Sequence, residues 1–191
     1  MTRDARRKIV VGVTGASGAP YAQRLISLLA AHPGVELACV LSTTAEEVWE
    51  LECGGHPRDL GVRTWGGRDY GAPFASGSAG WHAMAIVPCS MGTAGRIAGG
   101  VSESLLTRAA DVMLKERRTL VVVPREMPLS TIHLRNLLTL AEAGATVIPA
   151  APGFYGKPAG IADLVDAVVA RVLDHLGVEH DLGHRWGEGP R

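Results

Sequence analysis

The sequence contains few aromatic residues and no excess of charge of either sign. Aromatic side chains make up 5% of the 191 residues, and 19 basic residues balance 19 acidic ones. Without net charge, the chain lacks the broad electrostatic surface typical of proteins that bind nucleic acid or an anionic bilayer. Any functional cluster of cations must therefore be local.

Cysteines are also few, and long hydrophobic runs are missing. The spacing of Cys39, Cys53 and Cys89 matches neither a CxxC pair nor a zinc site, so we expect a reduced, cytoplasmic environment. No apolar run reaches the roughly 18 residues of a membrane-spanning helix. The short apolar run at residues 8–13 follows a basic start, as in a signal peptide, but is better interpreted as a buried first strand.

The residues that are present predict a single α/β domain covering 1–191. Continuous β-rich runs of the kind found in strands covered on both faces occur at 8–13, 35–41, 83–88, 119–123 and 145–149. Helical patterns lie between them. Pro20 suits a first helical turn, Ser104 and Ser130 are N-cap candidates, and a last helix is expected from about residue 161 to residue 176, before Gly177.

This alternation of strands and helices favours right-handed βαβ crossovers. It predicts a three-layer, Rossmann- or flavodoxin-like fold with a mainly parallel sheet. The exception is the stretch 52–80, which is rich in Gly, Arg and Ser and is expected to be an irregular excursion.

The loop after the first strand has features of an anion site. Its sequence, GVTGASG at 12–18, leads directly into a helix, whose N-terminal amides favour negative charge. The glycine spacing differs from the dinucleotide fingerprint, and the second strand ends in Ser42 rather than an acidic residue, which favours a mononucleotide. A tight turn that binds nothing is the alternative.

Two further strand ends carry polar residues. Residues 88–93, PCSMGT, follow the third expected strand, and Arg125 and Glu126 follow the fourth. Because ligands of open parallel sheets bind beyond the carboxyl ends of the strands, these loops are expected to converge on one ligand. Cys89 as a nucleophile is disfavoured because no base is identifiable beside it. A solvated loop ion pair is the alternative explanation for Arg125 and Glu126.

Other candidates lie on helices and in a Pro/Gly-rich loop. Arg108 and Lys115 are seven residues apart and share one helix face, although Asp111 between them also suits an ordinary surface ion pair. Tyr155 lies in the loop 149–158, where it suits a pocket cap. Arg171 borders the apolar stripe of the last helix, from which it can reach a pocket or solvent.

These motifs together resemble the UbiX-type flavin prenyltransferase family over nearly the whole chain. The shared segments are GxTGASG, LSTTA, APxASGS, PCSMGT, TRAADVxLKERRxLVxVPREMPLS, IHLRNLLxLxxAGA, PAAPGFYxKP and a terminal RWGE. The resemblance implies a flavodoxin-like flavoprotein that transfers a dimethylallyl group from dimethylallyl phosphate to N5 and C6 of reduced FMN. It also implies a homododecamer whose product serves UbiD-type decarboxylases.

Carried over by position, the resemblance implies roles for individual residues. The FMN contacts would be Gly15, Ala16, Ser17, Ser42, Ser90, Met91, Gly92, Thr93 and Arg125. Tyr155 and Arg171, helped by Lys115 and Arg108, would hold the prenyl phosphate, and Ser17, Lys115 and Glu126 would be catalytic. The chain departs from some relatives in having Tyr70 where they carry Trp and Gly92 where they carry Lys.

No metal is expected, because the Asp-rich motifs that chelate magnesium diphosphate in ordinary prenyltransferases are absent from the sequence. Two alternatives remain open. One is a flavin-dependent cysteine decarboxylase of the same fold, although its early catalytic histidine and PxMNxxMW motif are missing. The other is a non-catalytic flavin carrier that accompanies a decarboxylase.

Overall fold

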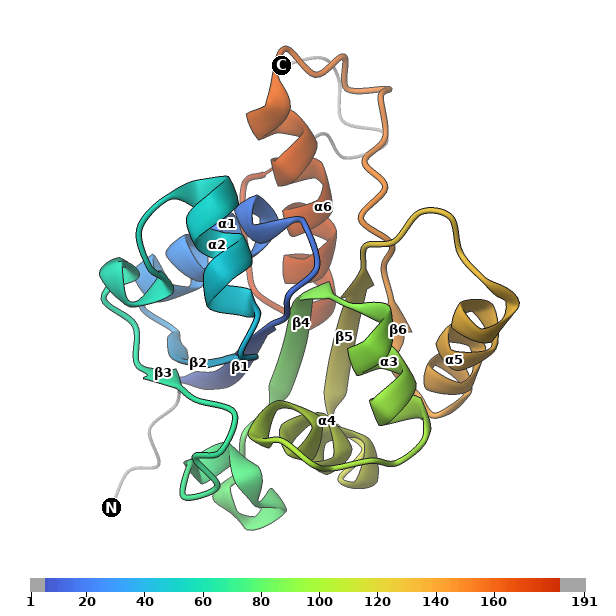
Figure 1. The fold of residues 1–191 in the computed structure, drawn as a ribbon. Coiled ribbons are helices and arrows are strands. Elements are labelled where there is room, and N and C mark those ends of the chain that lie inside the picture. The colour runs from blue at the N-terminus through green and yellow to red at the C-terminus, as the bar shows by residue number, and fades with distance from the viewer. Residues whose placement is uncertain (1–5, 183–191) are drawn as a thin grey trace.

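The computed structural model describes residues 6–182, and its centre is a six-stranded parallel sheet (Figure 1). The strand order is β3-β2-β1-β4-β5-β6. The strands are β1 (Arg7–Val13), β2 (Val35–Leu41), β3 (Thr64–Trp65), β4 (Ala83–Cys89), β5 (Thr119–Pro124) and β6 (Thr146–Val147). The chain moves outward from β1 to β3 and then returns to pair β4 with β1, so the order reverses between β1 and β4.

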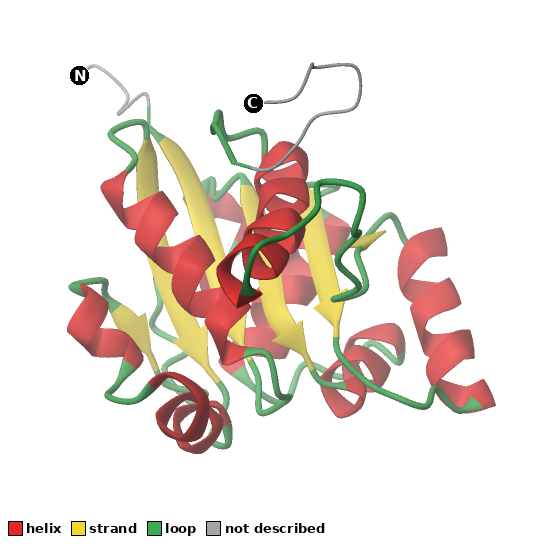
Figure 2. Ribbon diagram, turned by 90° about the horizontal axis from the view of Figure 1, so that it is seen from above, coloured by secondary structure: helices red, strands yellow, loops and turns green. Residues whose placement is uncertain are grey.

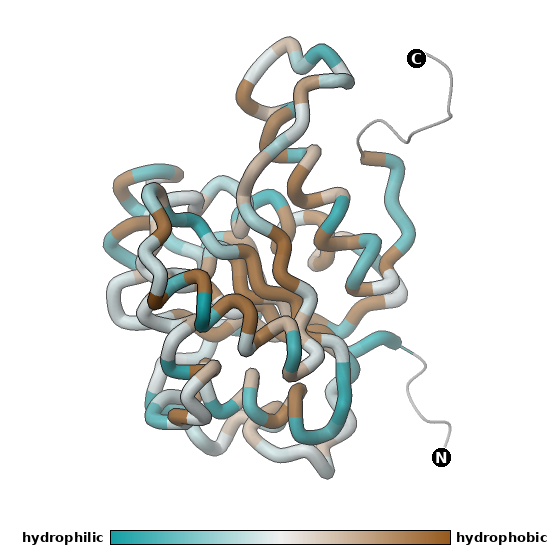
Figure 3. Tube along the Cα trace, turned by 90° about the vertical axis from the view of Figure 1, so that its right-hand side faces the viewer, coloured by the Kyte–Doolittle hydropathy of each residue, from teal (hydrophilic) through white to brown (hydrophobic). Residues whose placement is uncertain are grey.

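Helices cover both faces of this sheet, which gives the predicted three layers (Figure 2). One face carries α1 (Ala19–Ala31), α2 (Ala45–Cys53) and α6 (Ile161–Leu176); the other carries α3 (Met91–Ala98), α4 (Leu105–Lys115) and α5 (Thr131–Glu142). Alternate residues of β1 enter the two cores: Val11 faces α1 and α6, and Val10 faces α3 and α4. Figure 3 shows these hydrophobic strands enclosed at the centre of the molecule.

The predicted helix ends are confirmed. Pro20 lies in the first turn of α1, and Ser104 and Ser130 cap α4 and α5 by accepting hydrogen bonds from Thr107 N and His133 N. Gly177 ends α6 in the left-handed conformation, which glycine adopts without steric cost. These local signals are readable because each one satisfies backbone groups that a helix end would otherwise leave unpaired.

Several elements were not predicted. The stretch 52–80 contains the end of α2, the short 3-10 helices Pro57–Leu60, Pro73–Ala75 and Gly77–Ala79, and the two-residue edge strand β3. The helix α3, which begins at Met91 just after β4 ends at Cys89, was also not predicted. The helix that Ser130 begins carries an apolar pattern of Leu134, Leu137 and Leu138. Leu134 and Leu138 are 53% and 59% exposed, so this pattern does not mark a buried face of α5.

No helix within residues 6–182 is both long and apolar enough to cross a membrane. The terminal RWGE motif at 185–188 lies outside the described residues.

Candidate functional site

The carboxyl edge of the sheet gathers most of the predicted site residues. The loops after β1, β2, β4 and β5 all leave the sheet at this edge, next to the reversal between β1 and β4. Open α/β sheets bind ligands at such a reversal. The predicted residues brought to this edge are Gly15, Ala16, Ser17, Ser42, Ser90, Met91, Gly92, Thr93, Arg125 and Glu126.

The β1 loop packs tightly against the β2 loop. A Cβ atom added to Gly15 would lie 2.0 Å from Thr44 Oγ1, so the absence of a side chain at Gly15 is required by Thr44 before any ligand is considered. The backbone amides of Gly15, Ala16 and Ser17 donate no hydrogen bond to any described residue. They are therefore available as donors to an anion or a polar ring edge.

The N-terminus of α1 already holds a carboxylate. Glu52, at the end of α2, accepts hydrogen bonds of 2.8 Å from both Gly18 N and Ala19 N. Partial desolvation raises the pKa of Glu52, but hydrogen bonds from the Ser17 hydroxyl and these two amides, with the charge of Arg125, lower the pKa below its ordinary value overall. No sequence pattern points to Glu52, because only the fold brings the end of α2 to the start of α1.

Replacing Glu52 by alanine is expected to destabilise the protein by about 1 kcal/mol at neutral pH, because it removes an anion bound at a helix N-terminus. Because folding lowers the pKa of Glu52, its stabilisation is complete above the unfolded pKa of about 4.3 and is lost as pH falls through the lower folded value. Urea unfolding at several pH values checks this. Glu50→Ala, on an exposed position of the same helix, is the control; a Glu52→Ala effect that persisted in strong acid would contradict the assignment.

The β4 loop begins α3 and presents mainly backbone. Ser90 caps the helix, with its Oγ 3.3 Å from Thr93 N and 3.0 Å from Thr93 Oγ1. Met91 and Thr93 are only 6% and 8% exposed, as Ala16 is 6% exposed in the β1 loop, so these side chains pack inward. Ala16, Met91 and Thr93 can therefore contact a ligand at this edge mainly through their backbone amide and carbonyl groups.

Arg125 connects the end of β5 to the β1 loop. Its Nε donates a 2.9 Å hydrogen bond to the carbonyl oxygen of Ser17, which places a half-buried cation beside that loop. Glu126 is exposed, and its Oε1 accepts a 3.0 Å hydrogen bond from Met127 N. Among the described residues, no ion pair joins Arg125 to Glu126.

Three predicted cations lie on helices and have local carboxylate partners. Arg108 Nη1 lies 3.2 Å from Asp111 Oδ2, which is the surface pair given as the alternative in the sequence analysis. Lys115 Nζ lies 2.5 Å from Glu116 Oε1. The hydrogen bond and charge of Lys115 lower the pKa of Glu116. Arg171 Nη1 lies 2.6 Å from Asp174 Oδ2.

Lys115 and Arg171 are not brought to the carboxyl edge of their own chain. Lys115 ends α4 just before β5 begins, so it lies at the amino edge of the sheet. Arg171 lies in the second half of α6, which ends beside the start of β1, where Gly177 approaches the Arg7 guanidinium. Tyr155 is 83% exposed on the long loop between β6 and α6, which extends away from the sheet (Figure 1).

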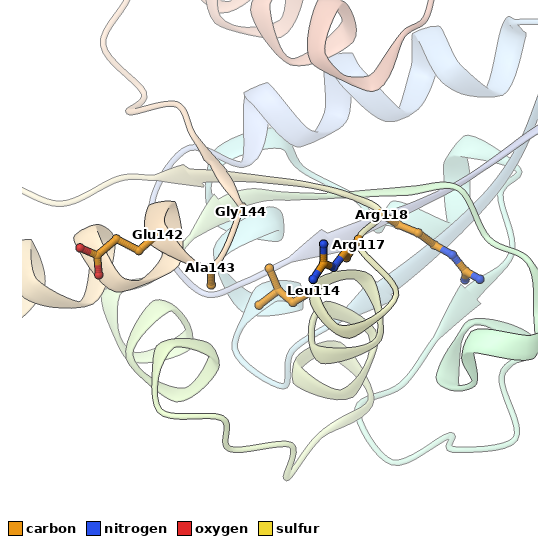
Figure 4. Close-up of a pocket in the computed structure, with 6 residues that line it drawn as sticks. All are labelled: Leu114, Arg117, Arg118, Glu142, Ala143 and Gly144. Carbon is orange, nitrogen blue, oxygen red and sulfur yellow. The ribbon is translucent and has the colours of Figure 1, made fainter.

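Two surface hollows lie elsewhere. The hollow drawn in Figure 4 has a volume of about 450 Å³ and lies between the C-terminal ends of α4 and α5. Its lining residues are Leu114, Arg117, Arg118, Glu142, Ala143 and Gly144. The second, of about 370 Å³, lies between the end of α1 and the segment after α6. Neither is lined by a predicted site residue.

Cys89 is not a nucleophile in this arrangement. It is fully buried, and desolvation raises the pKa of its thiol to about 12. The reactive thiolate is therefore essentially absent at neutral pH.

The fold and the site define the class of this protein. A parallel sheet whose order reverses between β1 and β4, with glycine and hydroxyl residues in the loops at that point, is a nucleotide-binding arrangement of the Rossmann-like class. A protein-family model described as Flavoprotein matches residues 1–173.

Comparison with individual relatives identifies the family within this class. The flavin prenyltransferase UbiX of Thermoplasma acidophilum is 48% identical over 182 residues, covering 94% of this chain and 99% of the relative. A dodecameric FMN-dependent UbiX-like decarboxylase from Escherichia coli O157:H7 superposes with a TM-score of 0.91 at 44% identity, covering 95% of this chain and all of that one. AnUbiX in complex with FMN and dimethylallyl pyrophosphate gives 0.86 at 42% identity, with coverages of 94% and 100%. The chain belongs to the UbiX flavin prenyltransferase family of flavoproteins.

Proposed function

We propose that this protein is a metal-independent flavin prenyltransferase that moves the dimethylallyl group of dimethylallyl phosphate onto N5 and C6 of reduced FMN. The observation that carries the proposal is the close match, at 42% identity over 94% of the chain, to a structure that holds FMN and dimethylallyl pyrophosphate. The residues at the carboxyl edge support it independently. The whole chain, 1–191, then serves as one flavin-binding domain.

The carboxyl edge suits FMN. It offers the unengaged amides of Gly15, Ala16 and Ser17, the half-buried hydroxyls of Ser42 and Ser90, and the guanidinium of Arg125. Amides and hydroxyls at strand ends bind phosphate, and a cation beside them favours an anionic ligand. Reduced FMN, when bound, supplies the nucleophilic ring atoms of the reaction.

Loss of phosphate from the prenyl donor requires charge stabilisation. Breaking the allylic C–O bond places negative charge on the departing phosphate, and cationic and hydroxyl donors lower the barrier by binding that charge. Lys115, Arg171 and Tyr155 are the proposed donors, with Arg108, on the same helix as Lys115, as a further proposed cation. Lys115 and Arg171 are already partly neutralised by Glu116 and Asp174, so they must share their hydrogen bonds with the phosphate.

Ring closure at C6 also requires proton transfer. Glu52, which accepts hydrogen bonds from the amides of Gly18 and Ala19, provides a carboxylate next to Ser17 and the β1 loop. Glu126 is solvent-exposed and makes no ion pair with its neighbour Arg125. These residues and the released phosphate are the candidate proton carriers.

A complete site in this proposal needs more than one chain, because Lys115 and Arg171 lie away from the carboxyl edge that holds the FMN residues. Exposed apolar side chains supply surfaces for association, including Leu134 and Leu138 on α5 and Phe154 beside Tyr155. We therefore propose a homododecamer, as described for the E. coli O157:H7 relative.

Leu138→Asp is expected to break the assembly into smaller species and to reduce prenyl transfer at least tenfold, because a charge then replaces a 59% exposed leucine on the α5 surface that is proposed to meet a neighbouring chain. Light scattering measures the mass against the 20.1 kDa subunit. Leu51→Asp is the matched control, because Leu51 is an 85% exposed leucine on α2, on the opposite face of the sheet from the α5 surface proposed for association. A fully active monomer would refute the shared site.

The product, prenylated FMN, is proposed to pass to a UbiD-type decarboxylase in the cytoplasm. Such a transfer needs no nucleic acid or membrane partner.

One assay separates the proposed activity from its two alternatives. The protein is mixed anaerobically with reduced FMN and dimethylallyl phosphate, and in parallel with a cysteine-derived thiol substrate. A new flavin species supports prenyl transfer. Thiol decarboxylation would instead indicate the cysteine decarboxylase, and unchanged FMN in both mixtures would indicate a carrier.

A further inference from the structure

Thr14 joins the two loops that flank the reversal in strand order. It is 2% exposed, and its Oγ1 donates a 2.7 Å hydrogen bond to the carbonyl oxygen of Pro88 at the end of β4. Thr14 Oγ1 also accepts a 2.8 Å hydrogen bond from Ser90 N. Thr14 N also donates to Pro88 O at 3.3 Å. Among the described residues, every hydrogen bond between the β1 and β4 loops involves Thr14.

This contact continues into the first turn of α3. Ser90, whose amide Thr14 holds, caps α3 through Thr93 N. The Thr14 hydroxyl therefore fixes the start of α3 relative to the β1 loop. Its donor and acceptor capacities are both used within the protein, and its burial keeps it from a ligand at the edge.

We infer that Thr14 is a positioning residue for FMN, which sets the separation of the β1 and β4 loops before the flavin binds. The inference rests on the proposed function, which places FMN contacts on both loops at Gly15–Ser17 and Ser90–Thr93. Without the hydroxyl, Ser90 N and Pro88 O lose a buried partner, and the flavin must order the two loops as it binds. Ordering on binding reduces affinity without removing any direct contact.

Valine tests this because it matches threonine in shape but lacks the hydroxyl. Thr14→Val is expected to weaken FMN binding about tenfold or more. At saturating FMN, its KM for dimethylallyl phosphate is expected to be unchanged, because the phosphate donors lie on other elements. Thr14→Ser keeps the hydroxyl and is expected to bind FMN within about threefold of the parent.

Thr107→Val is the matched control. Thr107 is 3% exposed, and its hydroxyl is likewise bonded within the protein, to Ser104 N at 3.1 Å and Ser104 O at 3.1 Å at the start of α4. Within residues 6–182, the Thr107 hydroxyl makes no hydrogen bond to the β1 or β4 loop. Loss of the Thr107 hydroxyl is expected to lower the melting temperature of the protein and to leave its FMN affinity unchanged.

The measurement is FMN titration by flavin fluorescence, below the melting temperature of every variant. Parental affinity in Thr14→Val, or an equal loss of affinity in Thr107→Val, would overturn the inference. If Thr14→Val does not fold, Thr14→Ala and Thr14→Ser take its place, and equal affinities in these two would overturn it. A parent protein that neither binds nor prenylates FMN would instead defeat the proposed function.

Discussion

Arg171→Ala is expected to lose dimethylallyl phosphate while keeping FMN. Arg171 is a proposed donor to the prenyl phosphate, and it lies on α6, away from the loops that carry the FMN residues. Its side chain is 61% exposed in the single chain, so it is accessible to a ligand or a neighbouring chain. When the proposed assembly desolvates the pair between Arg171 and the phosphate, removing Arg171 costs about 2–5 kcal/mol, which corresponds to roughly a 30-fold to several-thousandfold loss of affinity.

Substrate titration and flavin titration on the same variant measure the two affinities. Arg24→Ala is the matched control, because Arg24 also pairs with an aspartate of α6, through 2.7 and 3.1 Å hydrogen bonds to Asp166, but has no proposed role in binding. The assigned role of Arg171 is wrong if Arg171→Ala binds dimethylallyl phosphate like the parent.

Glu126→Gln is expected to bind both substrates and to stall turnover by about 10²- to 10⁴-fold, the usual contribution of general acid or base catalysis. The glutamine keeps the size and an acceptor oxygen for Met127 N, but it cannot exchange a proton. A carboxylate near a phosphate is repelled unless protonated, so a binding role for Glu126 is disfavoured.

Single-turnover absorbance spectra on Glu126→Gln, with an unfinished adduct accumulating, would support the proton-handling role. Glu142→Gln, an exposed glutamate at the end of α5, is the control. Normal turnover in Glu126→Gln would exclude Glu126 from the chemistry.

The sequence predicted the longer elements well, because their signals are local. β1, β2, β4 and β5 are runs of buried apolar residues, and the caps of α4 and α5 follow from single serines. The edge strand β3 was missed because its two residues carry no periodicity. The exposed leucines of α5 show that an apolar pattern identifies a face but not what covers it.

The candidate site was predicted in part for a similar reason. Residues at strand ends, such as Ser90 and Arg125, can be placed at one edge once a parallel sheet is expected. Glu52 and Thr14 could not be identified, because their importance depends on contacts with Ala19 and Pro88 that are distant in sequence. Spacing also places Lys115 on a helix face but cannot say that it lies at the opposite edge of the sheet.

The central claim is that this protein prenylates FMN. An anaerobic single turnover with reduced FMN and dimethylallyl phosphate in a chelator-containing buffer, followed by mass spectrometry of the released flavin, tests it most directly. We expect the parent protein to convert FMN to a flavin heavier by one dimethylallyl-derived unit, and Glu126→Gln to bind FMN without completing that conversion. Recovery of unmodified FMN from a folded, FMN-loaded parent protein would contradict the claim.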